Sequence, residues 1–421
     1  MTAIDVDPAR GWRLAAEQSG PEAALAASEL EAALGGPGVE GVEIALSHAN
    51  GTGDGFRRLG GPGRVELHGD SPRGLLFGAY RTLEDLGLRW PWPGRESGRA
   101  GAARLEELVE ESPALPGRCL VLGERALLED ADAWIGWAAR NRLNALFVHV
   151  STQREPAGAA PEATWRERRG NALELARQRG MTIEHGGHLL PELLRTEDLR
   201  ALAAGEPPSE DARRILVEHV RAHPEADVLH LWGADLPAGG SGGREASEAA
   251  LLTANTVAEV AEAERPNLQV AYLAYHDTTE VPRGVRPRAN VCLLFAPRER
   301  CYEHSLADPG CRRNQRHREL LLAQIEHFGA AGAAPPRVFE YWFDAILFAD
   351  GVPDLTATMA EDLRFYAETG VHSVQLLMTG HGRRPQPHPN PPAFARLAWD
   401  ATTARAQRSC SAAFSRSGPR C

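Results

Sequence analysis

The sequence predicts an α/β protein in which a small α/β domain precedes a (β/α)8 barrel of the TIM type. Three observations lead to this prediction. The chain has 421 residues, and at about 150 residues per domain this allows two or three domains, or a barrel with an attachment. Its hydrophobic content of 43% and charged content of 24% are those of a globular protein. Short apolar runs alternate with helical patterns after residue 117.

Residues 1–112 form the predicted N-terminal domain. Alternating apolar residues predict short strands at 42–45 and 64–67. The segment 73–86 carries leucines at helical spacing, with Ser71 as its N-cap, Pro72 at the first helical position and Gly87 as its C-cap. The segment 111–117 contains Pro113 and Pro116, which marks a linker. We therefore expect the domain boundary there.

Residues 117–400 form the predicted barrel. Strand and helix patterns alternate along them, which implies parallel strands joined by right-handed crossovers. The predicted strands are 119–122, 145–150, 182–185, 228–232, 270–275, 291–295, 338–342 and 373–378. The predicted helices between them include 131–140, 166–179, 211–222, 245–263, 314–328 and 355–369. Such repeats have the size of a TIM barrel. An open doubly wound sheet is the alternative, but no glycine-rich phosphate turn follows an early strand.

The last residues, 401–421, differ from the rest of the chain. They contain no acidic residue and no apolar period, and they are rich in Ser and Arg. This composition predicts a disordered or aberrant tail, such as a truncated or frame-shifted end would give.

Composition excludes several functions. All 46 basic residues are arginines, so a lysine Schiff base, a lysine general base and a GK[ST] phosphate loop are excluded. The net charge of −11 argues against broad nucleic-acid binding. No apolar run is long enough for a membrane span, and we expect no secretory signal. The six cysteines form no CxxC pair, which favours reduced thiols in a cytoplasmic protein. We expect no cofactor; the oligomeric state is left open.

Polar and aromatic residues gather at the predicted strand ends, where a TIM barrel carries its active site. In chain order they are Glu124, His149, His185, His188, Trp232, Asp235, Tyr275, His276, Arg298, Arg300, His304, Glu340, Tyr341, Trp342, Asp344, Thr379 and His381. Aromatic rings stack on the faces of sugars, and polar groups bind sugar hydroxyls. The pattern therefore favours a carbohydrate.

Asp235 and Glu340 are the predicted catalytic pair. Glycosidic bond cleavage needs a carboxylic acid that protonates the leaving oxygen and a carboxylate that attacks or activates water. Asp235 follows the fourth strand and Glu340 belongs to the seventh, and these two strands lie across the barrel mouth from each other. Glu340 lies within the aromatic run 339–342, where an acid must be paired or neutralised. The structural alternative is that Asp235 caps a turn and Glu340 pairs with an arginine.

The remaining candidates have more than one interpretation. In His185-Gly186-Gly187-His188 the histidines can contact substrate, play a structural role or bind a metal, but a zinc site lacks a third ligand at a recognised spacing. Arg298 and Arg300 can bind a substrate carboxylate or phosphate, or remain solvated loop charges. Cys301, His304, Cys311 and His317 are spaced too loosely to predict a metal site. We expect Trp90 and Trp92 to pack the two domains together and Asp277 and Asp344 to have supporting roles. No G-x-S-x-G serine elbow is present.

Several of these segments resemble known families. The residues Gly74–Tyr80 and Leu83–Trp90 resemble the small domain that precedes the barrel in family-20 β-hexosaminidases and family-67 α-glucuronidases. The barrel resembles a glycosidase-like family described as a domain of unknown function (DUF4838). The matching barrel segments are His185–His188, Trp232–Asp235, Ala271–Tyr275, Asn290-Val291, Arg300-Cys301 with His304, Cys311 and Asn314, and Glu340–Trp342. Together the resemblances cover roughly residues 40–380.

The resemblance implies glycoside hydrolysis, with the acid after strand four and its partner on strand seven. The chain departs from the family-20 pattern, because it lacks His-x-Gly-Gly-Asp-Glu and has Ala234-Asp235-Leu236 where a dyad is expected. This argues against substrate-assisted chemistry on N-acetyl sugars. Glycines and Ser241 at 239–243 replace a cysteine pair expected in the DUF4838 family, and a domain expected beyond strand eight is missing or scrambled in 401–421.

Together these inferences predict a glycoside hydrolase without a metal in its site. Asp235 is the expected general acid and Glu340 the expected nucleophile or base, and a uronic acid is a candidate substrate if Arg298 or Arg300 faces the site. The predicted sugar-binding residues are His185, His188, Trp232, Tyr275, His276, Arg298, Arg300, His304, Tyr341 and Trp342. The alternatives are an inactive carbohydrate-binding barrel, a metal-dependent hydrolase or isomerase that uses His185 and His188, and a scaffold protein.

Overall fold

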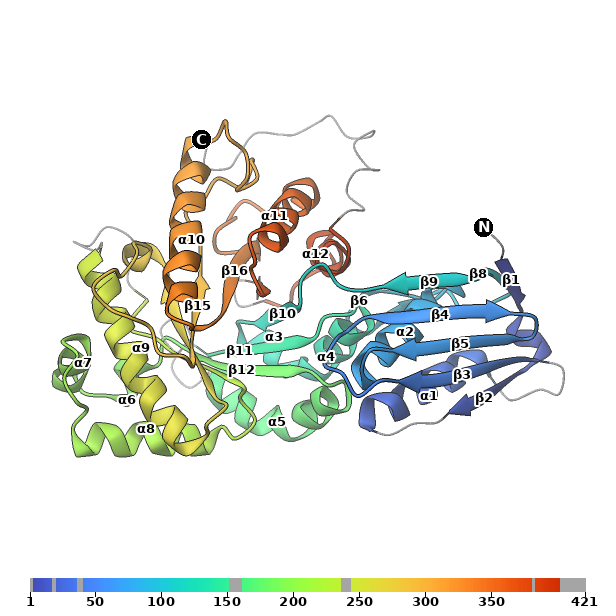
Figure 1. Ribbon diagram of the computed structural model, residues 1–421, viewed down its shortest axis with the longest axis horizontal. Coiled ribbons are helices and arrows are strands. Elements are labelled where there is room, and N and C mark those ends of the chain that lie inside the picture. Colours follow the sequence, from blue (N-terminus) through green and yellow to red (C-terminus); the bar gives the residue numbers. More distant parts are fainter. Residues whose placement is uncertain are drawn as a thin grey trace.

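A closed barrel of eight parallel strands forms the larger part of the molecule (Figure 1). The computed structural model describes residues 3–16, 20–35, 41–150, 161–235, 244–380 and 383–401. Each barrel strand pairs with the next along the chain, and the last pairs with the first. The strands are β10 (Gly117–Leu122), β11 (Ala145–His149), β12 (Thr182–Gly187), β13 (Val228–Leu231), β14 (Gln269–Ala274), β15 (Val291–Phe295), β16 (Ala334–Asp344) and β17 (Ser373–Thr379). The predicted fold class is confirmed.

Helices between the strands form the outer layer of the barrel (Figure 1). They are α3 (Arg125–Glu129), α4 (Ala131–Arg140), α5 (Pro161–Gln178), α6 (Leu190–Leu193), α7 (Thr196–Ala203), α8 (Glu210–Ala222), α9 (Arg244–Glu264), α10 (Arg312–Ala330), α11 (Thr356–Glu368) and α12 (Asn390–Trp399). A short 3-10 helix, η2 (His276–Thr278), follows β14. None of the helices in the described ranges is both long and apolar enough to cross a bilayer.

The N-terminal part is built around a sheet of β2 (Trp12–Ala16), β3 (Val42–His48), β5 (Arg64–Gly69), β4 (Phe56–Gly61) and β9 (Leu108–Glu111), in that order. Two helices, α1 (Pro21–Leu34) and α2 (Pro72–Asp85), pack together, and α2 packs on the sheet. Ser71 caps α2 by accepting a hydrogen bond from the Gly74 amide, as its sequence predicts. The smaller pairs are β1 (Ala3–Val6) with β8 (Ala103–Glu106), and β6 (Arg89–Trp92) with β7 (Arg95–Ser97); the 3-10 helix η1 (Pro8–Arg10) follows β1.

The small domain contacts the barrel where the barrel strands begin (Figure 1). Asp54 has a side chain that is only 3% exposed, and it accepts hydrogen bonds from Arg118 at 2.7 Å, Asn144 at 2.7 Å and Arg73 at 2.6 Å. Trp90 accepts a hydrogen bond from the indole of Trp137 on α4 through its carbonyl. These contacts leave the opposite, carboxyl end of the strands to carry a site.

Trp92 also belongs to this interface. Its ring lies 5.2 Å from that of Trp134 on α4. Both Trp90 and Trp92 therefore pack the domains together, as we expected from the sequence. Of the predicted tail, only residue 401 lies within the described ranges, and residues 402–421 lie outside them.

Candidate active site

Alternate residues of each barrel strand face the interior, and a buried polar network shows which ones. Glu184 of β12 accepts hydrogen bonds from His230 of β13 at 2.8 Å and from Gln375 of β17 at 2.6 Å, and its carboxylate lies 3.4 Å from Arg337 of β16. β12 and β13 are neighbours, as are β16 and β17, but the two pairs lie on opposite sides of the barrel. The contacts of Glu184 with Gln375 and Arg337 therefore place these side chains inside the barrel. Burial raises the pKa of Glu184, but Arg337 and the hydrogen bonds lower it by more than burial raises it. The net pKa is therefore below its usual value.

An aromatic layer lies above this network, toward the carboxyl ends of the strands. His188, at the end of β12, has its ring 5.2 Å from Trp232 and 6.4 Å from both His149 and Tyr275. The Tyr275 ring stacks at 6.5 Å on Tyr341 of β16. The rings therefore come from β11 to β14 and from β16. Four of these five residues, all except His149, are among those that the sequence predicted to bind sugar.

The two glycines of the His-Gly-Gly-His motif have a structural reason. Gly186 has a φ of 128°, and a Cβ there would lie 2.0 Å from the His230 carbonyl oxygen; the corresponding distance at Gly187 is 2.1 Å, to the Val150 carbonyl oxygen. A side chain would therefore separate β12 from its neighbours. The glycines allow the strands to approach one another, and His188 follows them into the aromatic layer, where Nδ1 lies 2.7 Å from the Gly233 carbonyl oxygen.

Charged groups border the aromatic layer. Asp344, at the end of β16, accepts a hydrogen bond from the Thr379 hydroxyl at 2.9 Å and lies 3.5 Å from Arg298. The Arg298 guanidinium lies over the Tyr341 ring, 5.8 Å from its centroid. Asp235, four residues beyond β13, lies on the same side of the barrel and is partly exposed. The site therefore offers an aspartate after β13 and another at the end of β16.

A β-bulge brings Asp344 to the inner side. In regular alternation after Tyr341, residue 343 would face inward and residue 344 outward. The register between β16 and β17 shifts between Glu340 and Phe343, so that Phe343 pairs with Met378 and Asp344 with Thr379. This shift turns Asp344 toward Thr379 and Arg298. Bulges often re-aim a side chain next to an active site.

Two further groups complete the border of the site. Glu124, directly after β10, is 8% exposed and accepts a hydrogen bond from the Gly380 amide at 2.9 Å. His276 follows Tyr275, has a left-handed φ of 49° and contacts the Glu299 carboxylate through Nδ1. Burial raises the pKa of Glu299, but contact with His276 lowers it more, and the net pKa is below the usual value.

The expectation that Glu340 faces the site is wrong. Its side chain is fully buried on the outer face of β16, where it accepts a hydrogen bond from Arg300 at 2.7 Å and another from the Tyr366 hydroxyl of α11. Arg300 also binds Asp362 of α11 at 2.6 Å. The predicted sugar ligand Arg300 is thus buried in the same cluster. Burial raises the pKa of Glu340 to about 7. The pairing of Glu340 with Arg300 is the structural alternative that the sequence analysis named for Glu340.

Three more predicted ligands face away from the site. Trp342 is fully buried against Phe394 of α12, outside the barrel. His304 lies in the loop after β15, with Nδ1 3.3 Å from Cys301 Sγ. His185 faces α8, where its ring stacks on His223 at 3.8 Å. Because His185 and His188 face opposite sides of β12, they cannot share a metal at the mouth, and the metal-dependent alternative built on them is wrong.

Two clusters in the described ranges have side chains that could ligate a metal, with ligand atoms within 4.8 Å of one another. They are His185 with His219 and His223, and Cys301 with His304 and Cys311. Cys301 is disulfide-bonded, so the second cluster has no free thiolate at that position. Neither includes a residue of the aromatic layer. The spacing of His219 and His223 along one helix is a signal that sequence reasoning missed.

Sequence reasoning also underrated His149 and Asp344. The alternation of β11 predicts that His149 shares the inner face of Phe147, whose ring lies 5.4 Å away. The position of Asp344 depends on the bulge, for which the sequence has no clear signal. His381, the candidate after strand eight, lies outside the described residues.

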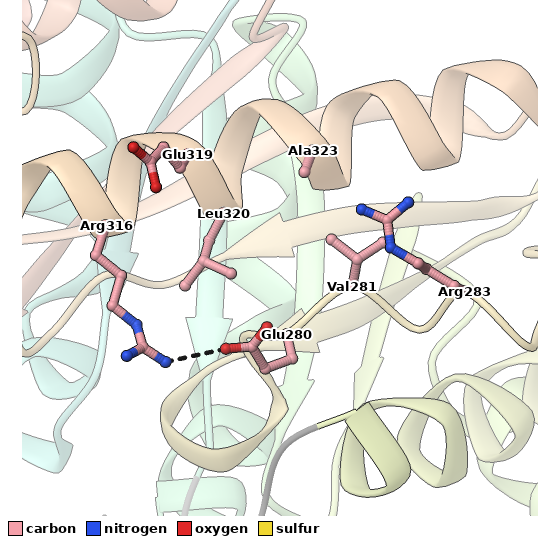
Figure 2. A pocket seen from close by; sticks show the side chains of 7 residues that line it. All are labelled: Glu280, Val281, Arg283, Arg316, Glu319, Leu320 and Ala323. Carbon is pink, nitrogen blue, oxygen red and sulfur yellow. Dashed lines mark hydrogen bonds and ion pairs between the residues drawn. The ribbon is translucent and has the colours of Figure 1, made fainter.

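A pocket of about 590 Å³ lies elsewhere, between the segment after η2 and helix α10 (Figure 2). Glu280 and Arg316 form an ion pair at 3.0 Å on its lining, beside Val281 and Leu320 (Figure 2). No residue of the predicted site lines it. The pocket is on the outer surface of the barrel layer, so we place the candidate site at the strand ends instead.

Comparisons with known proteins agree with the fold. A GH138 enzyme described as targeting pectin rhamnogalacturonan II matches with a TM-score of 0.60 at 12% identity, over 93% of this chain and 64% of its own. A GH115 4-O-methyl-alpha-glucuronidase with specificity for decorated arabinogalactans gives 0.61 at 11%, over 95% and 57%. A glycoside hydrolase family 20 beta-N-acetylglucosaminidase gives 0.59 at 16%, over 95% and 90%.

The chain spans less than two thirds of the GH138 and GH115 chains. No curated protein sequence matches it. Residues 239–404, which run from before α9 to just past the end of the described chain, match the family model for the domain of unknown function DUF4838. The resemblance stated from the sequence is thereby confirmed: the second part of the barrel matches the DUF4838 model, and the fold is like that of glycoside hydrolases.

Proposed function

We propose that the protein is a glycoside hydrolase that binds a sugar on the aromatic layer at the carboxyl ends of the barrel strands. The observation that carries this proposal is the convergence of aromatic rings and carboxylates there. Tyr275, Tyr341 and Trp232 offer ring faces to a sugar, and His188 and His149 offer polar edges to its hydroxyls. The glycosidase-like fold supports the reaction class by analogy.

Asp235 is the proposed general acid, as its place after the fourth barrel strand suggests. Asp344 takes the role that the sequence assigned to Glu340, since it is the carboxylate of β16 that turns toward Arg298 and Thr379. One of its oxygens accepts hydrogen bonds from the Thr379 hydroxyl and the Ile346 amide, both at 2.9 Å, which fix the orientation of the carboxyl group. Asp344 would act as nucleophile or base, and Asp235 would protonate the leaving oxygen.

Arg298 supports an acidic sugar as the substrate. Its side chain is 21% exposed, and its charge lies over Tyr341, at the edge of the proposed sugar platform. A guanidinium binds a carboxylate through two parallel hydrogen bonds. A uronic acid whose ring stacks on Tyr341 would bring its carboxylate to this group. Arg298→Gln should then raise KM for an aryl uronide more than for the neutral glycoside of the same configuration.

The central experiment measures hydrolysis of a panel of aryl glycosides and uronides by the wild type, Asp235→Asn, Asp344→Asn and Glu340→Gln. Loss of general acid–base catalysis costs about 10²–10⁴ in rate, so both aspartate variants should lose at least about 100-fold in kcat. Glu340→Gln is the matched control: molecules that remain folded by circular dichroism should keep kcat. A Glu340→Gln enzyme that folds but is inactive, or aspartate variants with wild-type rates, would contradict the assignment.

A carbohydrate-binding barrel without turnover is the second candidate. It is favoured by the strand-four segment, which has Asp235 alone where family-20 enzymes have a dyad. In that case a sugar would raise the melting temperature of the wild type, no member of the panel would be hydrolysed, and Tyr341→Ala would abolish the thermal shift.

A further inference from the structure

Three histidines meet between the barrel and its outer helix layer, away from the proposed sugar site. His219 and His223 are four residues apart at the end of α8, so they share one face of the helix. His185 reaches the same place from the outer face of β12. The ring of His223 lies 3.8 Å from that of His185 and 4.7 Å from that of His219. A ligand atom of each residue lies within 4.8 Å of the other two.

This is an unusual place for imidazoles. The neighbouring positions on the same side of α8 are Ala212, Leu216 and Val220, all buried apolar residues of the hydrophobic core. His185 is fully buried, His223 is 4% exposed, and His219 is half-buried. Neutral imidazoles offer nitrogen lone pairs, and a cation that accepts them suits the cluster best.

We propose that His185, His219 and His223 bind one Zn²⁺ ion that joins β12 to α8. Imidazole nitrogen is a preferred zinc ligand, with Zn–N bonds of about 2.0–2.1 Å. In tetrahedral geometry such bonds place the ligand nitrogens about 3.3 Å apart. The ligand atoms of the three histidines lie within 4.8 Å of one another, so each nitrogen–nitrogen distance has to shorten by about 1.5 Å at most. Three protein ligands leave the fourth position for a water molecule.

Glu225 provides the support that metal-bound histidines usually have. Its carboxylate lies 3.7 Å from Nδ1 of His223 and 3.8 Å from Arg169, and its side chain is only 6% exposed. An ionised carboxylate beside a ligating histidine orients its ring, and removing such a partner costs about 10–100-fold in metal affinity.

The site is structural and separate from the proposed hydrolysis. His185 is three residues before His188, and the two face opposite sides of β12. An ion at His185 would therefore fix the strand that carries His188 without touching a sugar. Its binding free energy would add to the stability of the native state, because a ligand that binds only the folded chain stabilises it.

The test uses the full chain without a histidine tag, stripped with a chelator and then supplied with ZnCl₂. Metal analysis after dialysis should find about one zinc per chain in the wild type. His219→Gln, at the half-buried position, should fold and lose at least about 100-fold in zinc affinity, and Glu225→Gln should lose about 10–100-fold. His327→Gln, a half-buried histidine of helix α10, is the matched control and should retain the zinc.

Two further readouts do not depend on enzyme activity. Co²⁺ in the wild type should give the visible absorption bands of a tetrahedral ion, and these should be absent in His219→Gln. Zinc should raise the melting temperature of the wild type and not that of His219→Gln. The proposal is overturned if no metal is retained, if His219→Gln binds as tightly as the wild type, or if the zinc is lost instead in Cys311→Ser, which alters the other cluster.

Discussion

The inner and outer faces of the barrel strands carry different chemistry. On the inner face of β16, Arg337 joins a network across the barrel, and Tyr341 contributes to the aromatic layer. On the outer face of the same strand, Glu340 is fully buried and accepts hydrogen bonds from Arg300 and Tyr366. On β12, His188 reaches the aromatic layer, and His185 contacts α8. Residues that are adjacent in sequence therefore have different roles, and each role depends on whether the side chain lies on the inner or the outer face of its strand.

The buried carboxylates on the two faces also differ in how their charge is neutralised. Outside, one guanidinium balances two carboxylates, because Arg300 binds both Glu340 and Asp362. Inside, Glu184 has Arg337 and two further partners. The outer cluster therefore depends on a single residue, and the inner one does not. Four experiments can break or sharpen this difference.

Removing Arg300 should have the largest effect. Arg300→Met leaves Glu340 and Asp362 buried without a cation, and loss of one partner of a buried ion pair costs about 3–5 kcal/mol. Chemical denaturation should show a decrease of this size in the free energy of unfolding. Arg283→Met, at an exposed position, is the control. A decrease below about 1 kcal/mol would show that the cluster is not what holds β16 to α11.

Removing Arg337 should cost less, about 2–3 kcal/mol, because Glu184 keeps hydrogen bonds from Gln375 and His230. Arg337→Met is compared with Arg300→Met by the same denaturation measurement. The double variant should be additive to within about 0.5 kcal/mol, since the two clusters share no residue. Equal losses in the two single variants would remove the distinction between the faces.

The outer layer should also make stability depend on pH through His317 of α10. Burial lowers the pKa of His317 from 6.5 to about 4; Glu299 raises it, and Arg300, Arg313 and Arg316 lower it. The folded state thus favours the neutral ring. Its contribution is complete above pH 6.5 and is lost as the pH falls from 6.5 toward 4, by on the order of 2 kcal/mol. His317→Asn should flatten this part of the stability curve; parallel curves would contradict the prediction.

We expect the smallest effect on stability when the hydroxyl of Tyr366, beside the Arg300 cluster, is removed and the result is compared with removal of the Tyr302 hydroxyl. The Tyr366 hydroxyl donates to Glu340, so Tyr366→Phe should cost about 1–2 kcal/mol. The Tyr302 hydroxyl is buried and has no hydrogen-bond partner within the described part of the chain, so Tyr302→Phe is the matched control and should be neutral or slightly stabilising. Melting temperatures of the two variants test this, and a reversed order would count against the cluster.

The sequence predicted the barrel well because its signal is repeated. Apolar strands and amphipathic helices alternate along the chain, and each repeat supports the same architecture. Prediction of the site was less complete. Nearness to a strand end identified Asp235, Trp232, Tyr275, His276, Arg298, His188 and Tyr341 as residues on the mouth side of the barrel.

Prediction from the sequence failed where a residue's role depended on which face of the strand its side chain occupies. Glu340 and Trp342 alternate with Tyr341, and the parity of a single strand cannot be read from sequence when both faces are buried. The bulge then reverses that parity before Asp344. Arg300 and His304 lie in a loop whose direction depends on hydrogen bonds to Asn314, ten residues after His304, and to Asp362, which is 62 residues after Arg300.

Asp54 connects the two domains more tightly than its place in a surface loop suggests. It neutralises Arg118, a fully buried residue at the first barrel strand, and burial lowers the pKa of that arginine to about 10. A barrel expressed from residue 117 would lose this counterion together with the aromatic partners of Trp399 at Phe56 and Phe77. The two domains should therefore melt in one calorimetric transition, and shortening the chain from its beginning should lower the solubility of the protein.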